Sequence, residues 1–357
     1  MSTEKLKDWG VSTGNMLLIA GPCSAESENQ ILQVARALAD RGATYLRAGL
    51  WKPRTRPGSF EGVGLRGLAW LDRARSETGL KIATEVAEPS HVDACLQFGV
   101  DLVWIGARTT TNPFSVQALA DALKGCDIPV LVKNPMNQDV GLWIGALERL
   151  ANAGLNKLGA IHRGVSSTQE MRCRNAPAWK MPIELMRKMP NLPMICDPSH
   201  ICGKSALIPA IAQEAMDLLF DGLMVEVHPD PTSALSDAAQ QLTPEIFLQM
   251  VAALRHPHEK GGDAAFEKRM SQLREKVDEM DSRLLEMLAQ RMEIVSEMGT
   301  LKAQQNVSTL QPHRWQEILR EREEHGAKLG LPSDFVDHIM QTLHEEAIRR
   351  QEEARLT

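Results

Sequence analysis

The sequence lacks any hydrophobic run that approaches the roughly 18 or more apolar residues of a membrane span. It also lacks a recognisable targeting segment, because its first residues, MSTEKLKDWG, are charged from the start. These two absences predict a cytoplasmic protein that has no membrane partner.

Paired cysteine motifs are absent as well. The chain has six cysteines, none of them in a CxxC pair, which excludes a disulfide scaffold and favours single thiols in a reducing compartment.

The formal net charge of -6 argues against general nucleic-acid binding, so local basic clusters are expected to be binding sites. A length of 357 residues exceeds most single cores and predicts one large domain and a smaller one.

Eight short runs rich in Val, Ile and Leu are present, and helical patterns follow most of them. Such alternation predicts a (β/α)8 TIM barrel. A doubly wound open sheet is the alternative, but no GxGxxG turn follows the first run. The runs cover residues 16–24, 43–50, 81–86, 102–106, 129–134, 158–164, 192–200 and 222–228.

Polar residues stand at the ends of these runs, where the strands of such a barrel converge on a pocket. One Lys at a strand end is usually a solvated rim residue. Several cations around one mouth repel each other unless an anionic ligand offsets the repulsion. The pattern therefore predicts a pocket for phosphates and carboxylates. The residues are Cys23, Arg47, Lys52, Glu85, Arg108, Lys133, His162, Arg163, Asp197, His200, Glu226 and His228.

The loop RAGLWKPRTRPGSF carries Arg47, Lys52, Arg54 and Arg56 between Pro and Gly residues. Its cations thus lie on a backbone shaped for turning and not on a solvated helix face, which predicts a phosphate-binding loop. A basic surface loop is the alternative.

Four ligand-type residues suggest a divalent metal site: Cys23, His200, Glu226 and Asp237. A thiolate favours zinc or iron, whereas carboxylates favour manganese or magnesium. We expect manganese, with iron, zinc or cobalt as alternatives. Ligands from separate strands favour a catalytic ion over a structural zinc. The simplest alternative for Cys23 is that it is a small buried apolar residue and binds no metal.

A second unit follows the segment RHPHEKGGDAAF, in which Pro, Gly and charge interrupt both patterns. We expect a barrel over residues 1–254, a linker over 255–263 and an all-α domain of three helices over 264–357. The first helix, from Phe266 to about Asn306, cannot bury its apolar stripe alone. The small domain is therefore predicted to form a homodimer, and dimers that pair into tetramers remain open.

Cations interrupt the apolar row of this long helix at Arg274, Arg291 and Lys302. Burial of an unpaired cation costs several kcal/mol, so an anion that pairs with these residues is expected. A pocket for a dicarboxylate and an interhelical salt bridge both fit this pattern.

The motifs of the first part together carry a family resemblance. GPCSAES, LRAG, KPRT, IGAR, KNP, HRG, CDPSH and MVEVHPDP occur in this order over residues 10–250. This part resembles 3-deoxy-D-arabino-heptulosonate 7-phosphate (DAHP) synthase, which condenses phosphoenolpyruvate with erythrose 4-phosphate. The KPRT sequence at residues 52–55 favours erythrose 4-phosphate over the arabinose 5-phosphate used by related octulosonate-phosphate enzymes.

The resemblance also implies roles for individual residues. The metal ligands would be Cys23, His200, Glu226 and Asp237, and the erythrose 4-phosphate site would be Arg54 and Thr55. Phosphoenolpyruvate would bind Arg47, Lys52, Arg108, Lys133 and Arg163. The residues assigned to catalysis are Lys52, Glu85, His162 and Asp197; Glu85 would hold a water, and the group that moves each proton is left open.

Residues 264–355 resemble the all-helical chorismate mutases, which convert chorismate to prephenate. The resemblance implies a ligand site formed by Arg291, Lys302, Arg314 and Gln351 of one chain. Arg274 of the partner subunit would complete this site. Gln311, Trp315 and Ala347 stand where some members have acids and a Ser. Prephenate is the expected feedback effector. A dimerising and sensing module without catalysis is the alternative for this domain.

Overall fold

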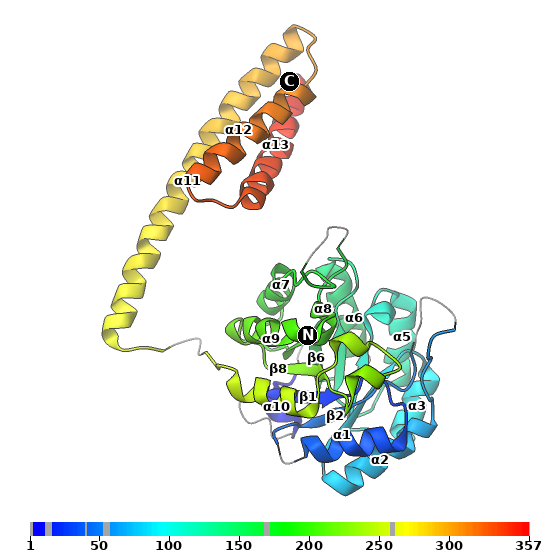
Figure 1. Ribbon diagram of the computed structural model, residues 1–357. Coiled ribbons are helices and arrows are strands. Elements are labelled where there is room, and N and C mark those ends of the chain that lie inside the picture. Colours follow the sequence, from blue (N-terminus) through cyan, green and yellow to red (C-terminus); the bar gives the residue numbers. More distant parts are fainter. Residues whose placement is uncertain are drawn as a thin grey trace. The chain divides into compact units, whose positions relative to one another are not determined.

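The computed structural model describes residues 3–10, 16–39, 41–52, 58–167, 172–257 and 261–356. The chain divides into two compact units, Met1–Glu259 and Lys260–Thr357. Figure 1 shows a barrel with surrounding helices in the first unit and an all-helical second unit. The two units are described separately below.

The first unit is a closed parallel barrel whose eight strands follow each other in chain order, and β1 pairs with β8. Each run predicted as a strand contains one, so the predicted (β/α)8 fold is confirmed. The strands are β1 (Leu17–Gly21), β2 (Tyr45–Arg47), β3 (Lys81–Val86), β4 (Leu102–Ile105), β5 (Val130–Lys133), β6 (Leu158–His162), β7 (Met194–Cys196) and β8 (Gly222–Glu226).

Helices cover the outside of the barrel, and polar caps fix where several of them begin. The Ser27 side chain accepts a hydrogen bond from the Gln30 backbone N–H at the start of α1, and Asp139 caps α6 in the same way through Leu142. The helices are α1 (Glu28–Leu38), α2 (Arg66–Thr78), α3 (Pro89–Gln97), α4 (Ala107–Thr110), α5 (Pro113–Ala122), α6 (Val140–Asn152), α7 (Lys180–Lys188), α8 (Pro198–Cys202), α9 (Ile208–Asp217) and α10 (Pro244–Ala253), with short 3-10 turns η1 (Leu6–Trp9), η2 (Ser205–Leu207), η3 (Pro231–Ser233) and η4 (Ala238–Gln240).

Alternation along the strands separates an inner apolar cluster from the layer under the helices. The inner cluster includes Trp9, whose helical turn η1 precedes β1, and its other members are Leu17, Ile19, Tyr45, Ala83, Leu102, Trp104, Leu131, Ile161, Ile195 and Met224. In a β-strand, the residue two positions after an inward-facing residue also faces inward. This rule carries Arg47, Glu85, Lys133, Asp197 and Glu226 to the barrel interior at the carboxyl ends of their strands.

The second unit contains α11 (Ala264–Gln304), α12 (Pro312–Lys328) and α13 (Ser333–Leu356). Small residues allow the helices to approach closely: a Cβ on Gly299 would lie 2.7 Å from the Gln351 Cα. From Ala264 to Met287 every side chain of α11 is exposed except Met270, which is half-buried. Among the described helices, none is long and apolar enough to cross a membrane.

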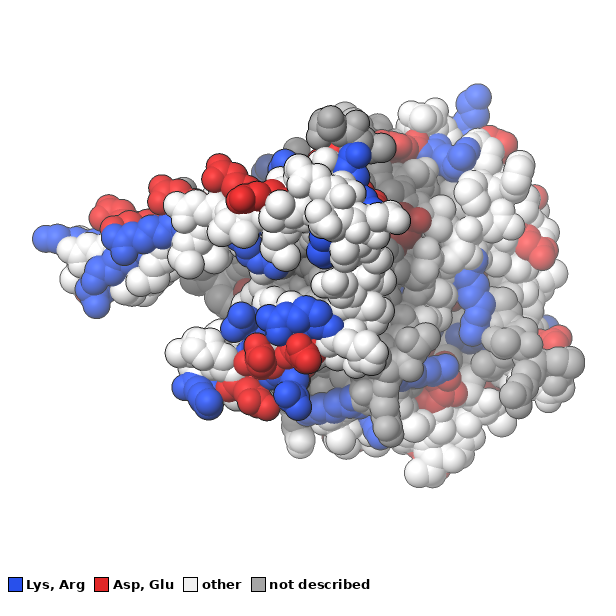
Figure 2. Space-filling view, turned by 90° about the horizontal axis from the view of Figure 1, so that it is seen from above, with Lys and Arg blue, Asp and Glu red and all other residues white. Residues whose placement is uncertain are grey.

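Basic and acidic side chains are intermixed on the face of the molecule in Figure 2. Arg47, Lys133 and Arg163, by contrast, are all at least 94% buried, with 1%, 4% and 6% of their surface exposed. These three cations therefore contribute little to the outer surface, and their charges must be compensated inside the barrel.

Candidate active sites

A buried network of opposite charges lies at the carboxyl end of the barrel. Lys133 Nζ lies 2.6 Å from Asp197 Oδ2, and Arg47 Nη1 lies 3.3 Å from Glu226 Oε1. The Trp104 ring supports both cations, at 4.9 Å from the Arg47 Cζ and 5.9 Å from the Lys133 Nζ. Because each buried charge has an opposite partner, the network avoids the cost of an isolated buried ion.

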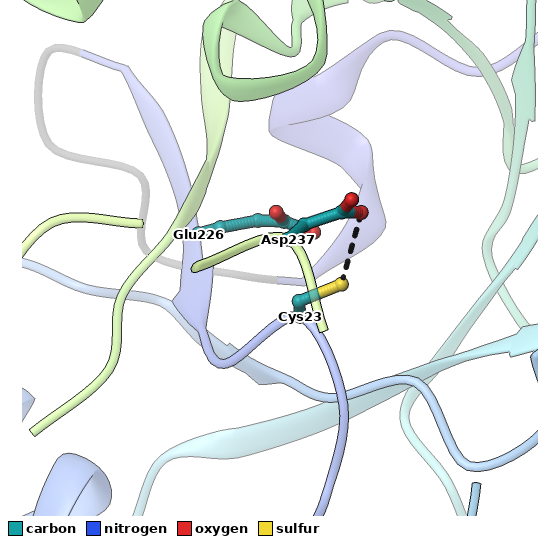
Figure 3. A group of neighbouring side chains, drawn as sticks. All are labelled: Cys23, Glu226 and Asp237. Carbon is teal, nitrogen blue, oxygen red and sulfur yellow. Dashed lines mark hydrogen bonds between the residues drawn. The ribbon is translucent and has the colours of Figure 1, made fainter. Parts of the chain in front are cut away.

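Three of the four predicted metal ligands come together beside this network. One ligand atom from each of Cys23, Glu226 and Asp237 lies within 4.8 Å of the others. Figure 3 shows the Cys23 sulfur beside the Asp237 carboxylate, and the thiol donates to Asp237 Oδ2 at 3.5 Å. Glu226 Oε1 is buried without a hydrogen-bond partner among the described residues. A soft sulfur and two carboxylates with a spare lone pair form a donor set that fits a divalent cation.

His200 lies next to this group. Its Nε2 is 3.8 Å from Glu226 Oε1, and its Nδ1 is 2.8 Å from Asp197 Oδ2. An imidazole fixed through one nitrogen by a carboxylate presents the other nitrogen as a ligand, an arrangement common among metal-binding histidines. The position of His200 is therefore compatible with a fourth ligand, although its atoms lie outside the compact group of three.

Burial and charge act in opposite directions on the ionisable groups of the cluster. Burial, followed by the negative charge of Glu226, raises the pKa of the Cys23 thiol to about 12. Burial also favours the neutral form of Asp237, but the charges of His200, Arg174 and Lys52 outweigh it and lower the pKa of this carboxyl. The thiol thus keeps its proton near neutral pH.

The open pocket above the cluster is lined mainly by charged side chains. Arg163 is one of its buried cations, and burial lowers the pKa of its guanidinium to about 10, so the group stays charged at neutral pH. Such a pocket suits small anions that carry phosphate or carboxylate groups. The lining residues are Glu85, Gly106, Ala107, Arg108, Lys133, Met136, Arg163, Arg174, His200 and Asp237.

A hydrogen bond from the indole of Trp104 fixes one oxygen of the Glu85 carboxylate. Its Oε2 accepts a hydrogen bond from Trp104 Nε1 at 3.0 Å. Its Oε1 sits against Gly106, where an added Cβ would come within 2.2 Å of it. Gly106 therefore makes room for this carboxylate at the wall of the pocket.

Some predicted site residues lie elsewhere. The His162 ring is buried beside the rings of Trp143 and Trp179 in the layer under the helices, and burial lowers its pKa to about 4. Its neighbour Arg163 faces the pocket instead. Alternation along the strand explains this difference of one residue.

Asp197 is fully buried and does not line the pocket. Its Oδ1 accepts the His200 backbone N–H at 3.1 Å, while its Oδ2 contacts Lys133 and the His200 ring. It can therefore act on the pocket only through these neighbours.

Lys52 reaches the group of predicted metal ligands, where its Nζ lies 3.4 Å from Cys23 Sγ. Arg54 and Thr55, predicted to bind a phosphate, lie outside the described residues, as does Arg56. The sequence reasoning missed Arg174, which lines the pocket and lies 3.3 Å from Asp237 Oδ1. No strand-end position identified it, because it belongs to a loop.

The second unit holds a separate pocket of about 450 Å³ between its helices, within the range of roughly 300–1,000 Å³ usual for ligand sites. Lys302 Nζ lies 2.9 Å from both Gln351 Oε1 and the Thr309 carbonyl oxygen. Among the residues that line this pocket, none is Asp or Glu. They are Met287, Gln290, Arg291, Ile294, Val295, Met298, Lys302, Thr309, Gln311, Arg314, Trp315, Ile318, His344, Ala347 and Gln351.

Arg274 does not line this pocket. It stands about five helical turns, or roughly 25 Å, before Arg291 on the same helix. A single copy of the chain therefore cannot bring both Arg274 and Arg291 to one ligand. The Trp315 and His344 rings, stacked with centroids 3.8 Å apart, form part of the pocket wall.

Comparisons with known proteins match both units. The model of the DAHP synthetase I family matches residues 6–258, and the model of chorismate mutase type II matches residues 273–352. A phospho-2-dehydro-3-deoxyheptonate aldolase of Thermotoga maritima is 32% identical over 250 residues, which cover 70% of this chain and 72% of the relative. A 2-dehydro-3-deoxyphosphooctonate aldolase of Syntrophotalea carbinolica is 27% identical over 245 residues, covering 63% and 84%.

Solved structures agree with these matches. The crystal structure of the Thermotoga maritima DAHP synthase superposes with a TM-score of 0.62 at 32% identity, covering 68% of this chain and 69% of that one. A truncated form of the Thermotoga maritima enzyme gives a TM-score of 0.58 at 29% identity, covering 68% and 86%.

The buried pair of Lys133 and Asp197 generates a prediction about stability. We expect Asp197→Ala to lower the free energy of unfolding of the barrel by about 3–5 kcal/mol, because it leaves a buried ammonium unpaired. Urea denaturation of the full chain measures the change. The control is Glu184→Ala, which breaks an exposed pair with Arg187 and should cost about 1 kcal/mol or less. Equal losses in the two variants would contradict the prediction.

Proposed function

The chain belongs to the DAHP synthetase I family and ends in a type II chorismate mutase domain, and on this premise we propose how its residues perform the two reactions. The protein is a bifunctional enzyme of the shikimate pathway, with DAHP synthase and chorismate mutase activities. We assign the synthase to residues 1–254 and the mutase to 264–357, joined by the linker 255–263. The division between residues 259 and 260 supports this assignment.

Phosphoenolpyruvate and erythrose 4-phosphate are the proposed substrates of the barrel. Arg108, Lys133 and Arg163 line the pocket and would bind the phosphate and carboxylate of phosphoenolpyruvate. Arg47 is buried below, where it donates to the Cys23 carbonyl oxygen at 3.0 Å and pairs with Glu226. Its charge would favour the anionic substrate from beneath the site. Arg54 and Thr55 are proposed to bind the phosphate of erythrose 4-phosphate.

We place a divalent metal ion among Cys23, Glu226, Asp237 and His200. The lone pair of Glu226 Oε1 without a hydrogen-bond donor and the mixed sulfur and oxygen donors support this proposal. Manganese is the proposed ion, and iron, zinc and cobalt also fit the donor set. When bound, such an ion supplies a Lewis acid for the aldehyde substrate.

Two groups of the chain are placed to handle water and protons. Glu85 lines the pocket with one carboxylate oxygen fixed by Trp104, so we propose that the other oxygen orients the water that adds to the substrate. Lys52, beside the Cys23 sulfur, is the proposed proton donor. The buried ring of His162 does not line the pocket, so we give it no part in proton transfer.

The pocket of the helical unit is proposed to hold chorismate between cationic groups. Arg291, Lys302 and Arg314 would bind its two carboxylates, and Gln351 would orient Lys302 near the ether oxygen. Such a clamp accelerates a one-substrate rearrangement by holding its reacting ends together. A sensing module without catalysis is the alternative, and an assay of chorismate consumption distinguishes the two.

We propose that two copies of the chain pair through the helical unit. Exposed apolar side chains run along the first half of α11, including Leu273, Val277, Met280 and Leu284. A second copy would cover this stripe and could bring its Arg274 to the pocket that holds Arg291. Further pairing of dimers into tetramers is compatible with this arrangement.

We further propose that prephenate regulates the synthase. A ligand that binds the helical unit can change barrel activity only if its affinity differs between two states of the protein. The glycines of the proposed linker would permit reorientation between such states. The fusion of two steps of one pathway that do not follow each other directly favours feedback over transfer of an intermediate.

The cytoplasm is the proposed location of the enzyme. All six cysteines are free, which agrees with a reducing compartment. No nucleic acid is needed as a partner for either reaction.

The donor set around Cys23 is the observation that carries the synthase proposal, and a metal-exchange assay tests it. Phosphoenolpyruvate consumption is measured with erythrose 4-phosphate before EDTA treatment, after it and after addition of manganese. Activity that disappears and returns supports the substrate pair and the metal. Arabinose 5-phosphate is the control aldehyde. Consumption that is unaffected by complete metal removal would overturn the metal proposal, and preference for arabinose 5-phosphate would overturn the substrate.

The protonated thiol of Cys23 makes metal binding depend on pH. Its pKa of about 12 means that the ion must displace a proton at any pH near neutrality. We expect the metal dissociation constant to fall by about tenfold for each unit of rising pH between roughly pH 6.5 and 8.5. Competition with a coloured chelator measures it. Cys23→Ala should bind more weakly with a flatter dependence, and a constant affinity in the wild type would refute the proton displacement.

Gly106 provides a test of the role of Glu85. Gly106→Ala should lower synthase kcat/KM by about 100-fold, because the added Cβ forces the Glu85 carboxylate out of position. Steady-state kinetics measure the loss. Gly145→Ala in α6 is the matched control, since its Cβ would meet no atom within 4 Å. Unchanged kinetics in Gly106→Ala would show that Glu85 need not occupy its observed position.

The apolar stripe of α11 predicts the effect of a buried charge on dimerisation. Leu284→Asp should raise the dimer dissociation constant by about 100-fold or more and reduce mutase activity with it. Analytical ultracentrifugation and chorismate consumption report the two effects. Ser282→Asp, which introduces the same charge at another exposed position of α11, should change neither. A Leu284→Asp chain that stays dimeric would place the interface elsewhere.

Prephenate should inhibit the synthase activity of the full chain through the helical pocket. We expect the inhibition constant to rise about tenfold or more in Lys302→Ala, because a carboxylate loses its charged partner. Synthase assays with increasing prephenate measure this effect. Lys268→Ala, at the exposed start of α11, is the control. Equal inhibition of wild type and Lys302→Ala would mean that prephenate acts outside this pocket.

A further inference from the structure

Two loops that are distant in sequence carry two of the proposed metal ligands. The first follows β1 and holds Cys23, and the second follows β8 and holds Asp237. Asp237 has a backbone φ of +47°, an angle that side-chain-bearing residues rarely adopt. Something outside the Asp237 residue itself must therefore keep its loop in this conformation.

Gln241 joins the two loops through both ends of its amide. Its Oε1 accepts the Cys23 backbone N–H at 3.0 Å, and its Nε2 donates to the Ser236 carbonyl oxygen at 2.8 Å. The side chain is 2% exposed. Both hydrogen bonds are thus shielded from water. Loss of a hydrogen-bond partner is costly in such a buried position.

Two further contacts join the same loops. The hydroxyl oxygens of Ser24 and Ser236 are 2.6 Å apart, and the Leu235 backbone N–H donates to Glu26 Oε1 at 2.8 Å. The residues adjacent to each proposed ligand are therefore tied to the opposite loop. A shift of one loop alone would break several hydrogen bonds at once.

Gln240 acts on the third ligand. Its Nε2 donates to Glu226 Oε2 at 2.8 Å, and its Oε1 accepts from Arg174 Nη1 at 3.1 Å. Arg174 also pairs with Asp237 Oδ1. With Oε2 held by this amide, the orientation of the Glu226 carboxylate is fixed, and Oε1 lies 3.3 Å from Arg47 Nη1 and 3.8 Å from His200 Nε2.

We propose that Gln240 and Gln241 are positioning residues for the metal site, which set the spacing of Cys23, Glu226 and Asp237 and thereby the affinity for the ion. This inference rests on the proposed metal site. Neither glutamine lines the substrate pocket, so their effect passes through the ligands that they hold. Partners of this kind typically change metal affinity by about 10–100-fold.

Charge-changing variants of nearly equal size test the proposal. Gln241→Glu keeps the acceptor for Cys23 but replaces the donor to Ser236 by a second carboxylate oxygen. Gln240→Glu removes the donor to Glu226 and places another carboxylate beside it. Gln97→Glu, at an exposed position of α3, controls for the added charge. The full-length protein is stripped of metal and titrated with cobalt(II), whose charge-transfer absorption reports thiolate ligation.

We expect both variants to raise the cobalt dissociation constant by about 10–100-fold, and Gln97→Glu to leave it within about twofold. Gln241→Glu should also weaken the thiolate absorption, because loss of the hydrogen bond to the Ser236 carbonyl oxygen loosens the loop of Asp237 against the residue that holds the Cys23 backbone. Gln240→Glu should keep that absorption. At saturating metal, the KM for phosphoenolpyruvate should stay near the wild-type value in both.

A merely structural role would lower the thermal midpoint of the metal-free protein and leave the cobalt spectrum and affinity unchanged. That result, with dissociation constants within about threefold of wild type, would overturn the proposal. If Gln241→Glu does not fold, Ser24→Ala removes a single contact between the loops and should still weaken cobalt binding. A wild-type chain without thiolate absorption would instead overturn the metal site itself.

Discussion

The compensation of buried charge at the carboxyl end of the barrel is the constraint on which the synthase unit depends. Lys133, Asp197, His200, Glu226 and Arg47 form a chain in which cationic or proton-bearing groups alternate with carboxylates. Each member satisfies a neighbour that would otherwise be isolated in an apolar interior. The same chain holds Glu226 near Cys23 and His200 next to Glu226, so the arrangement that permits burial also assembles the proposed metal site.

The two units attract anions by different means. The barrel pocket combines cations with Glu85 and Asp237, so it can hold substrates and also position water and a metal ion. The helical pocket has cations and amides, and no acid among the residues that line it. Such a pocket favours binding of dicarboxylates in general. This difference agrees with the two different reactions of the units, and it is compatible with the proposed binding of prephenate to the helical unit.

The sequence predicted which strands carry the site better than it predicted which side chains enter it. Arg163 and His162 were both assigned to the pocket because both end the same run. The structure separates them, since neighbouring residues of a strand face opposite sides of the sheet. Counting in steps of two from the apolar Ile161 would have selected Arg163 and excluded His162. Asp197 passes that count yet stays below the pocket, because Lys133 and His200 occupy its oxygens.

The (β/α)8 order, the helical second unit and the charged strand ends were predictable from the chain, because apolar periodicity and strand-end chemistry are local properties. Which loop residues meet depends instead on the three-dimensional closure of the fold. Arg174, Gln240 and Gln241 carry no periodic signal, and their contacts exist because closure of the barrel through β1 and β8 brings together loops that are distant in sequence. Long-range pairing, and not local preference, therefore sets the geometry of the proposed metal site.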